Sequence, residues 1–268
     1  MTAVLKLLRD DAHVSVSSLQ TYLKCPAQYE HRYVRRTPIE NRPGALAFGS
    51  AVHASLATYY TALRDVVSSA PELSVPTADE LAQTFRDAWQ RETESDPPLL
   101  LGENETVDSL TDTGVAMLAV FAAQVVPPAA VTDVEMAFAV EVDEDGTRLV
   151  GVLDAVVRDE DGTYRILEHK TAGRRWTPDR LASDLQLTAY SLAAPLLGLG
   201  DAAVDVQLLL KTKKPAFEVL HAARTDADRR DLVATVAGVT KAIRAGAFYP
   251  VRDWHCRGCQ YAGACVAG

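Results

Sequence analysis

The sequence predicts an α/β or α+β fold in which a helical region precedes a β-rich core. Apolar residues recur at helical spacing through much of the first 128 residues. After residue 129, β-branched residues dominate several short segments, and Asp-Gly pairs, which favour tight hairpin turns, separate the first of them. A helix, two more strands and a last helix follow. This order fits one core with a helical insertion before it.

The first part of the chain is predicted to consist of helices and loops. Ser17 and Gln20 have capping-box spacing and predict a helix start, with an apolar face just inside it. A loop rich in Pro, Gly and Asn is expected from Thr37 to Gly44, and two prolines predict another from Ser68 to Thr77. Further helices are expected over residues 52–66, 79–94 and 106–126.

The second part alternates strands and helices. Three strands are expected first, as a meander whose turns lie at Asp145-Gly146 and Asp161-Gly162. The expected strands cover residues 131–142, 147–157, 164–170, 204–211 and 217–222, and the expected helices cover residues 181–197 and 226–245.

Composition excludes several classes of protein. The chain has 268 residues, of which 48% are apolar and 24% charged, as in ordinary globular proteins. Disorder, a collagen-like repeat and a disulfide-dense miniprotein do not fit these values. No apolar stretch reaches the roughly 18 residues of a membrane-spanning helix, and Met1 to Arg9 lack the layout of a signal peptide. We therefore expect a cytoplasmic protein with no membrane partner, built as one large domain or two small ones.

The segment from Gly151 to Thr171 is the most informative. A hairpin centred near Asp161 pairs Asp154 with Glu168 to within one residue. Glu168 and Lys170 are two residues apart on one strand, so they share a face of the sheet, and His169 points to the other face. The ionisable side chains of Asp154, Glu168 and Lys170 are therefore expected to lie close together on one face of the sheet.

Such a cluster has a chemical use and also an alternative explanation. Two carboxylates can hold Mg²⁺ or Mn²⁺, and a nearby lysine can orient an attacking water or stabilise charge on a phosphate. The alternative is a cross-strand salt bridge on a solvated face. The neighbouring residues, however, are largely apolar, as in a central strand covered on both faces, where charges need a partner or a metal. These neighbours are Val150, Val152, Leu153, Ile166 and Leu167.

These residues also resemble a known family. The pattern G-x-L-D, followed after fourteen residues by E-x-K, resembles the PD-(D/E)xK nuclease superfamily and specifically its RecB-like branch. That branch includes CRISPR-associated RecB-like exonucleases and the nuclease domains of AddAB-type helicase–nucleases. Four further segments resemble the family's motifs in the right order. They are Ser15 to Val34 (the N-terminal RecB/AddB-type motif), Gly49 to Leu56 (the histidine motif), Gln186 to Tyr190 (Q-x-x-x-Y) and Cys256 to Cys265 (the C-terminal cysteine motif).

The resemblance implies a fold and a domain plan. It implies a restriction-endonuclease-like core, with a central mixed sheet flanked by helices, an N-terminal helical region and an iron–sulfur staple. Residues 1–268 would then form a single nuclease domain. Its parts would be a mainly helical part over residues 1–128, an α/β catalytic core over residues 129–247, and a cysteine-rich tail over residues 248–268 that pairs with Cys25.

The resemblance also implies roles for single residues. Asp154, Glu168 and Lys170 would be catalytic, and His53 would join the two carboxylates as a metal ligand. A helical histidine is otherwise more often structural, but Gly49 and the small residues near it would let this helix approach the sheet closely. Glu135, on the preceding strand, is a weaker candidate for positioning metal or substrate, and a salt bridge is its alternative role.

A pair of residues on the helix after the hairpin completes this group. Gln186 and Tyr190 lie four residues apart and share a helical face. In the family such a pair faces the active site and contacts DNA. The alternative is a helix packed through Tyr190, with Gln186 at its rim.

The four cysteines form a one-plus-three pattern. Cys256, Cys259 and Cys265 lie close together, and Cys25 stands far earlier in the chain. Such a set can ligate a [4Fe–4S] cluster or a zinc ion, and the spacing does not choose between them. The resemblance favours the cluster. Thiols without any ligand role are the remaining alternative.

The net charge of −9 argues against a protein that coats nucleic acid, so a nuclease would need a local basic track. Arg174 and Arg175, just beyond Lys170, are the best candidates, and Trp176 beside them could stack on a base. The other candidates are Arg32, Arg35, Arg36, Lys211, Lys213 and Lys214.

Together these expectations describe a metal-dependent DNA nuclease with a [4Fe–4S] cluster. The resemblance implies an exonuclease that prefers single-stranded DNA or free ends and acts in recombination, repair or CRISPR-type DNA processing. No phosphate-binding G-x-x-x-x-G-K-[ST] loop occurs, so a helicase or recombinase would be a separate partner. One alternative is a non-catalytic or partner-dependent DNA-binding accessory protein. Another is a zinc-stapled protein with a different hydrolytic role.

Overall fold

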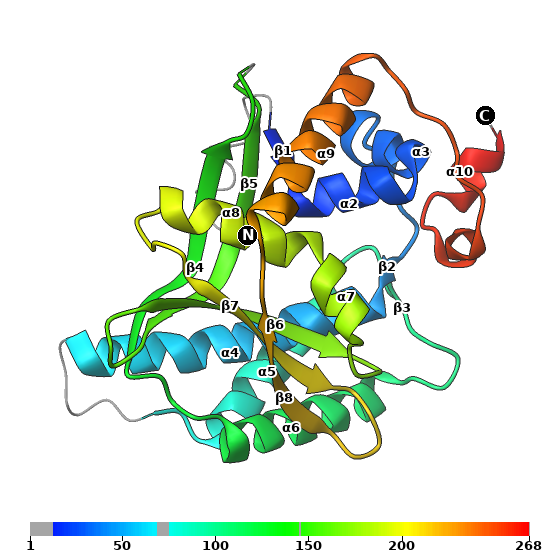
Figure 1. Cartoon of the computed structure of the whole chain (residues 1–268). Helices are drawn as coiled ribbons and strands as arrows, with labels where there is room; N and C mark the ends of the chain where they lie inside the picture. Colours follow the sequence, from blue (N-terminus) through cyan, green and yellow to red (C-terminus); the bar gives the residue numbers. More distant parts are fainter. Residues whose placement is uncertain (1–12, 69–74, 145, 268) are drawn as a thin grey trace.

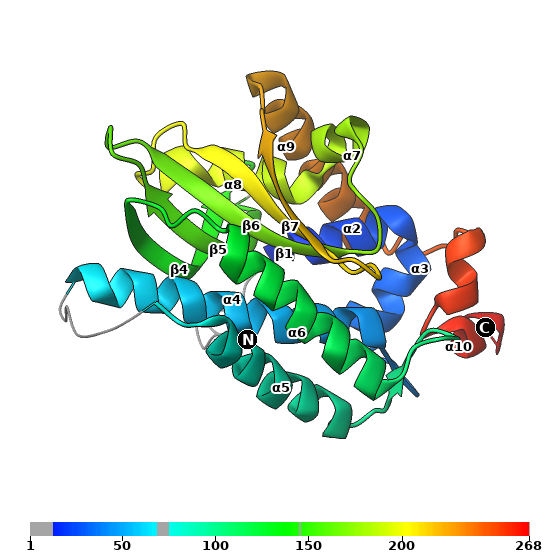
Figure 2. The same ribbon diagram turned by 90° about the horizontal axis from the view of Figure 1, so that it is seen from below.

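The computed structural model describes residues 13–68, 75–144 and 146–267. Its central sheet lies between two layers of helices (Figures 1 and 2). The predicted α/β architecture with a central mixed sheet flanked by helices is therefore confirmed. The predicted turn residue Asp145, most of the loop predicted over residues 68–77, and the segment from Met1 to Arg9 lie outside the described residues.

The sheet has six strands and mixed directions. β4, β5 and β6 form the predicted antiparallel meander, β6 pairs with β7 in parallel, and β8 closes the sheet beside β7. β1 pairs in parallel with the start of β5 and was not predicted. The strands are β1 (His13–Ser15), β4 (Ala130–Glu141), β5 (Arg148–Arg158), β6 (Tyr164–Ala172), β7 (Ala203–Leu210) and β8 (Ala216–Ala222).

One edge of β5 has a gap that positions the candidate site. β4 pairs along one edge of β5, so β1 and β6 share the other edge. β1 pairs only with residues 148–150 and β6 only with residues 155–158. Residues 151–154 therefore lack a strand partner on that edge, and Asp154 is the last of them.

Three long helices cover one face of the sheet (Figure 2). Their facing side chains and those of the sheet form a core that contains the buried aromatic residues Phe48, Tyr60, Phe85, Trp89 and Phe121. Capping boxes at Thr77 and Thr106 start the second and third helices. The helices are α4 (Gly44–Ser68), α5 (Ala78–Glu94) and α6 (Val107–Gln124).

Other helices cover the opposite face and build a second core with it. The early helix α2 lies in this layer beside α8 and α9, so the helical region at the start of the chain is divided between the two layers (Figure 1). The elements are α2 (Val16–Lys24), α7 (Pro178–Ser183), α8 (Leu185–Leu196) and α9 (Asp226–Arg244). Short pieces are α3 (Pro26–Tyr29), η1 (Glu30–Val34), η2 (Trp254–Gly258), α10 (Ala262–Ala267), β2 (Arg42–Pro43) and β3 (Leu99–Leu100).

Three predicted helices have other boundaries in the structure. The helix predicted over residues 52–66 already begins at Gly44. The first helix is capped by Ser15, not Ser17, because Ser15 and Ser18 exchange the reciprocal capping-box hydrogen bonds. The helix predicted over residues 181–197 is two helices. Asp184 leaves helical geometry between them, and its carboxylate accepts hydrogen bonds from the backbone of Gln186 and Leu187, which restarts the helix as α8.

Among the described residues, no helix is long and apolar enough to cross a membrane.

Candidate active site

Asp154 lies where β5 and β6 part. Its Oδ2 accepts a hydrogen bond of 2.8 Å from the backbone N–H of His169, which takes the place of a strand contact. Its Oδ1 lies 3.5 Å from Nδ1 of His53 on α4. The β5–β6 register is the predicted one, since Ala155 pairs with Leu167 immediately beside the two acids. The structure therefore brings His53 and Asp154 together from segments far apart in the sequence.

Four side chains from β6 and α8 form a closed ring of polar contacts, here called the active-site ring. Lys170 forms an ion pair with Glu168, and Lys170 Nζ donates to Gln186 Oε1 at 2.7 Å. Gln186 Nε2 donates to the Tyr190 hydroxyl at 2.6 Å, and that hydroxyl lies 2.7 Å from Glu168 Oε2. The same hydroxyl also reaches the carbonyl oxygen of Val152 at 2.7 Å, inside the gap of β5.

Burial and neighbouring charges shift the ionisation of these groups. Burial, together with the negative charge of Asp154, raises the pKa of Glu168 to about 7. Burial also acts to raise the pKa of Asp154, but the hydrogen bond and charge of His53 outweigh it and hold that pKa below its usual range. For Lys170, burial lowers the pKa and the Glu168 carboxylate raises it by more, so the lysine stays charged. The site therefore contains two acids in contrasting environments.

His169 points away from Glu168 and Lys170, as predicted. Its ring stacks on Tyr60 of α4, with centroids 5.2 Å apart, and meets the His53 ring edge-on at 5.9 Å. Both ring nitrogens are buried without a hydrogen-bond partner among the described residues. Burial lowers the pKa of His169 to about 4, so the ring is neutral and serves as packing at ordinary pH.

The donor atoms suit a hard divalent cation. Within the described parts of the chain, no three His, Cys, Asp or Glu side chains are already arranged closely enough to hold a metal ion. The chemistry of the set nevertheless fits, because two carboxylates and an imidazole are the ligands that Mg²⁺ or Mn²⁺ would meet here. The raised pKa of Glu168 supports the fit, since burial and the adjacent charge of Asp154 both disfavour its carboxylate, and a bound cation would favour it.

The close approach of α4 to the sheet does not depend on Gly49 in the way expected. A methyl group at Gly49 would lie 3.6 Å from Thr171 Oγ1, which is an ordinary contact. Gly151, in the gap of β5, has the stricter requirement, because a methyl group there would lie 2.6 Å from the Phe138 ring. Sequence reasoning passed over this glycine, although its place in the G-x-L-D pattern was a usable signal.

Glu135 has no hydrogen bond or ion pair with the cluster. It is exposed on β4 and forms no hydrogen bond or ion pair within the described residues. Its backbone has a φ of 51°, between the pairs Val134–Ala155 and Met136–Leu153. It therefore lies across from Asp154 in a distorted part of the strand.

Only some side chains of the predicted basic track are exposed and outside ion pairs, as contact with a DNA phosphate would require. Arg174 is exposed, whereas Arg175 forms an ion pair of 2.6 Å with Glu218 of β8. The interpretation of Trp176 as a stacking platform is wrong, because its ring is 8% exposed and packs in the core under the guanidinium of Arg180. Of the other candidates, Arg32, Arg36, Lys213 and Lys214 are exposed, while Arg35 and Lys211 pair with Glu30 and Glu105.

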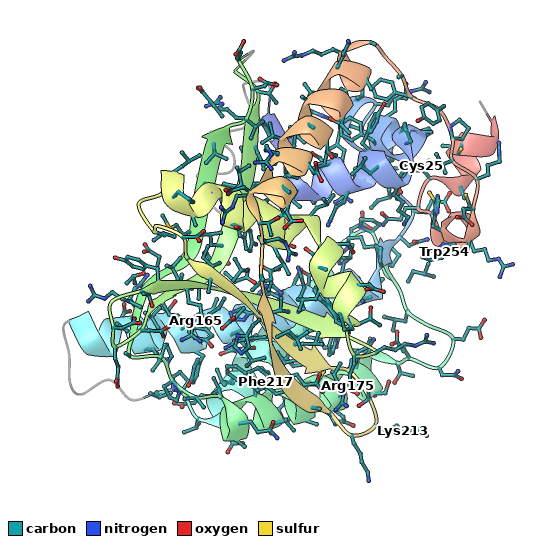
Figure 3. All side chains as sticks on the ribbon, in the orientation of Figure 1. Cys25, Arg165, Arg175, Lys213, Phe217 and Trp254 are labelled. Carbon is teal, nitrogen blue, oxygen red and sulfur yellow. The ribbon has the colours of Figure 1, made fainter. Side chains whose placement is uncertain are left out.

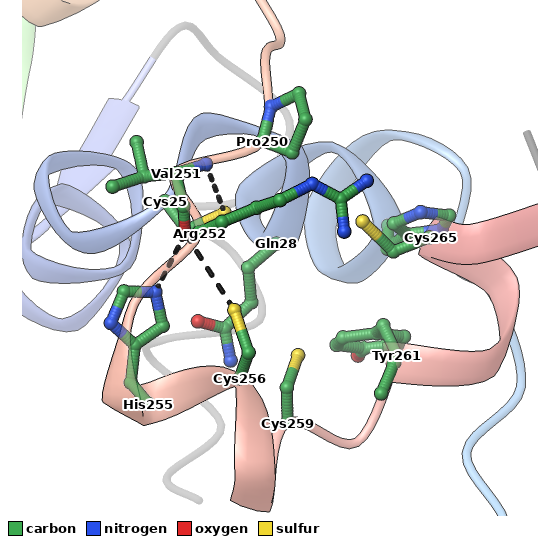
Figure 4. A pocket seen from close by; sticks show the side chains of 12 residues that line it. Cys25, Gln28, Pro250, Val251, Arg252, His255, Cys256, Cys259, Tyr261 and Cys265 are labelled. Carbon is green, nitrogen blue, oxygen red and sulfur yellow. Dashed lines mark hydrogen bonds between the residues drawn. The ribbon is translucent and has the colours of Figure 1, made fainter.

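The four cysteines line one small cavity, here called the cysteine cavity (Figure 4). Its volume is about 70 Å³. Cys25, which is labelled in Figure 3 and lies between α2 and α3, faces Cys256, Cys259 and Cys265 of the tail (Figure 4). The sulfur contacts are weak: Val251 N lies 3.5 Å from the Sγ of Cys25, and the Sγ of Cys256 lies 3.7 Å from Val251 O. All four cysteines are free thiols, so no disulfide links the tail to α2.

Comparison with known proteins identifies the family. The sequence model of the PD-(D/E)XK nuclease superfamily matches residues 13–266, and the chain belongs to this superfamily. A crystal structure from Eubacterium rectale, of a protein provisionally named an exonuclease, superposes with a TM-score of 0.59 at 12% identity, over 97% of this chain and 92% of that one. The structure of the protein SSO0001 has a TM-score of 0.47 at 14% identity, over 98% of this chain and 90% of that one. A search of curated proteins finds no match.

Proposed function

We propose that this chain is a RecB-like, metal-dependent DNA nuclease that hydrolyses phosphodiester bonds. The observation that carries the proposal is the meeting of Asp154, Glu168, Lys170 and His53 at the gap in β5. An ordinary cross-strand salt bridge would not need the hydroxyl of Tyr190 and the amide of Gln186 to hold its members in a ring.

The chain's own groups have separable tasks. Lys170 has three N–H donors; Glu168 and Gln186 take two of them, which leaves one for a phosphate oxygen or a water. Tyr190 and Gln186 fix the direction in which that donor points. His53, Asp154 and Glu168 would hold Mg²⁺ or Mn²⁺, which would polarise the phosphodiester and lower the pKa of a bound water.

For the substrate, we propose DNA that is single-stranded or has a free end, cut as an exonuclease. Arg174 supports this, because it is exposed just after the strand that carries Lys170 and can contact a phosphate. The provisional name of the Eubacterium rectale protein points to the same activity. Recombination, repair or CRISPR-type DNA processing in the cytoplasm, with a helicase or recombinase as partner, are the contexts that the RecB-like motifs imply.

For the tail, we propose a [4Fe–4S] cluster held by Cys25, Cys256, Cys259 and Cys265. The gathering of all four thiols around one cavity supports a bound group, and the cavity is large enough for more than a single ion. The cluster would join the tail to the N-terminal helices within one domain spanning residues 1–268. Anaerobic purification followed by iron, sulfide and zinc analysis separates the cluster from a zinc ion.

A cleavage assay tests the nuclease. End-labelled single-stranded and double-stranded DNA would be incubated with Mg²⁺, Mn²⁺ or EDTA. The wild type would be compared with Lys170→Ala, and with Lys213→Ala as an exposed-lysine control. We expect metal-dependent cutting that Lys170→Ala abolishes and Lys213→Ala retains, and the labelled end gives the polarity. If folded wild type with its tail loaded does not cut, the chain is instead an accessory or partner-dependent protein.

A further inference from the structure

The helix that carries Gln186 and Tyr190 is also bound on its other side. Thr188 lies two residues after Gln186, which turns its side chain by about 200° around α8, away from the active-site ring. Its hydroxyl accepts a hydrogen bond of 2.8 Å from Nε of Arg224, which lies between β8 and α9. α9 lies beside α8 in the same layer (Figure 1). Arg224 therefore contacts α8 on the face opposite to the ring.

The same guanidinium also binds the junction between α7 and α8. Its Nη2 donates to the carbonyl oxygens of Leu181, at 2.7 Å, and Asp184, at 3.2 Å. Leu181 belongs to the last turn of α7, where carbonyl groups lack a partner within the helix, and Asp184 separates the two helices. Nη1 donates to the carbonyl oxygen of Ala223 at 2.8 Å, which fixes the guanidinium against its own backbone. The three nitrogen atoms thus connect both helices to one point.

The backbone that carries Arg224 is itself fixed on both sides. Two residues earlier, Ala222 pairs with Val204 in the sheet. The next residue, Thr225, starts α9 through a capping box with Asp228. Arg224 therefore extends from a short connection between two regular elements, and its side chain links these elements to α7 and α8.

The junction lies close to the proposed chemistry. Asp184 Oδ1 accepts a hydrogen bond of 2.9 Å from the backbone N–H of Gln186, and Gln186 Oε1 accepts the bond from Lys170. The negative charge of Asp184 also favours the charged form of Lys170. A shift of the junction would therefore be passed directly to the side chain that sets the direction of Lys170.

We propose that Arg224 is a positioning residue of the nuclease site, which fixes the α7–α8 junction so that Gln186 keeps Lys170 directed toward the substrate. This inference rests on the proposed nuclease function. The role requires the planar fork of arginine, because the acceptors lie at separate points on two helices. A lysine carries all its donors on one atom and cannot serve them together.

NMR of the full chain, without DNA or divalent metal, tests the positioning independently of catalysis. The probe is the side-chain amide signal of Gln186 in protein made with isotope-labelled glutamine, identified by its loss in Gln186→Ala. Arg224→Ala and Arg224→Lys should both shift this signal. Arg229→Ala is the matched control, because Arg229 of α9 binds the same face of α8 through Ser191 at 2.9 Å, one turn after Thr188. It should leave the Gln186 signal unchanged.

Cleavage kinetics test the consequence for the reaction. Arg224→Ala should lower kcat about tenfold and change KM less than about twofold, because misplacement of a reacting group lowers the rate more than the binding of substrate. Arg224→Lys should lose a similar share of kcat, whereas Arg229→Ala should keep the wild-type value. If Arg224→Ala does not fold, Thr188→Val, which removes the hydroxyl that binds Nε, replaces it in both measurements and should give a smaller effect in the same direction.

Three results would overturn the proposal. The first is an unchanged Gln186 signal in the folded variant, and the second is an equal change in Arg229→Ala, which would show that any loss of contact disturbs α8. The third is a shifted signal with an unchanged kcat, which would make the contact of Arg224 purely structural. If the wild type does not cut DNA, the nuclease proposal fails, and the NMR comparison still decides whether Arg224 positions Gln186.

Discussion

The active-site ring and the cysteine cavity are held together in different ways. In the ring, Glu168 is 1% exposed, and each side chain contacts the next through a hydrogen bond or ion pair. In the cysteine cavity, the thiols contact little besides the backbone of Val251, and Cys256 is exposed. The first site is organised by the sheet and α8. The second is a set of free thiols that line a small cavity.

This difference in contacts indicates which of the two sites can form without a bound metal or cluster. Protein contacts alone position the ring, so loss of metal should leave it intact. The tail is attached to the N-terminal helices by a few contacts, among them the bond from Ala27 N to Tyr249 O and the stacking of His31 on Tyr261. We infer that a bound group supplies most of the remaining attachment of the tail.

The largest expected effect is on the cysteine cavity. Replacing all four cysteines by alanine should lower the free energy of unfolding by about 4–5 kcal/mol, because the proposed cluster closes a loop of most of the chain. Thermal and denaturant unfolding of anaerobically purified protein measures this. Trp254→Ala, a 77% exposed side chain of the same tail, is the control and should be neutral. If the four-alanine variant has the wild-type melting temperature, the cysteine cavity does not stabilise the fold.

The opposite behaviour is expected in the active site. Asp154→Asn should reduce metal-dependent cleavage at least about 100-fold, since it removes a proposed metal ligand. It should lower the stability of the metal-free protein only slightly, because the loss of the contact with His53, which lowers the pKa of Asp154, is offset by the loss of repulsion with Glu168. Cleavage rates and melting temperatures are measured together, with Asp161→Asn in the exposed hairpin turn as control. A large loss of stability would show that Asp154 has a structural role.

Much of the catalytic hairpin could be predicted because its determinants are local. Asp161 accepts hydrogen bonds from Thr163 within the turn, and that turn sets the register that brings Asp154 beside Glu168. Alternation along β6 then places Lys170 with Glu168 and turns His169 away. These relations need only the spacing of residues along one hairpin.

The remaining features depend on contacts between distant segments. The gap in β5 arises because β1, from the start of the chain, shares an edge with β6, and no local pattern indicates this. The basic neighbours of Trp176 predict a place at the surface, but this residue, which lies between β6 and α7, packs in the core. The approach of His53 to Asp154 was expected from the family resemblance, since helical periodicity alone does not indicate which strand α4 meets.

Within the ring, Tyr190→Phe should cost about 2 kcal/mol of stability. The change removes the buried hydroxyl that lies 2.7 Å from both Glu168 Oε2 and the Val152 carbonyl oxygen. At least one of these acceptors then loses its donor, and an unsatisfied buried polar group costs about 1–3 kcal/mol. Denaturant unfolding measures it. Tyr59→Phe is the matched control, because Tyr59 is also buried but its hydroxyl makes no hydrogen bond within the described residues. Equal costs for the two variants would mean that the ring contributes nothing beyond packing.

The most gradual expected effect is a pH dependence of stability in the metal-free protein. Folding raises the pKa of Glu168 from its ordinary 4.5 to about 7, so between these values the folded state holds the proton more tightly than the unfolded state. The stabilisation is present in full below pH 4.5 and is lost as pH rises through about 7, with a slope of at most about 1.4 kcal/mol per pH unit. Unfolding in EDTA across this range measures the slope.

Glu168→Gln should flatten that part of the curve, because glutamine does not titrate. Saturating Mg²⁺ should also flatten it in the wild type, since a cation at Asp154 and Glu168 removes the repulsion that favours the proton. The cysteine cavity has no comparable response in this range if its thiolates are held by a cluster. If the free energy of unfolding of Glu168→Gln still falls with pH over this range, the titrating group is not Glu168. The stability of the site would then not depend on the protonation of this buried acid.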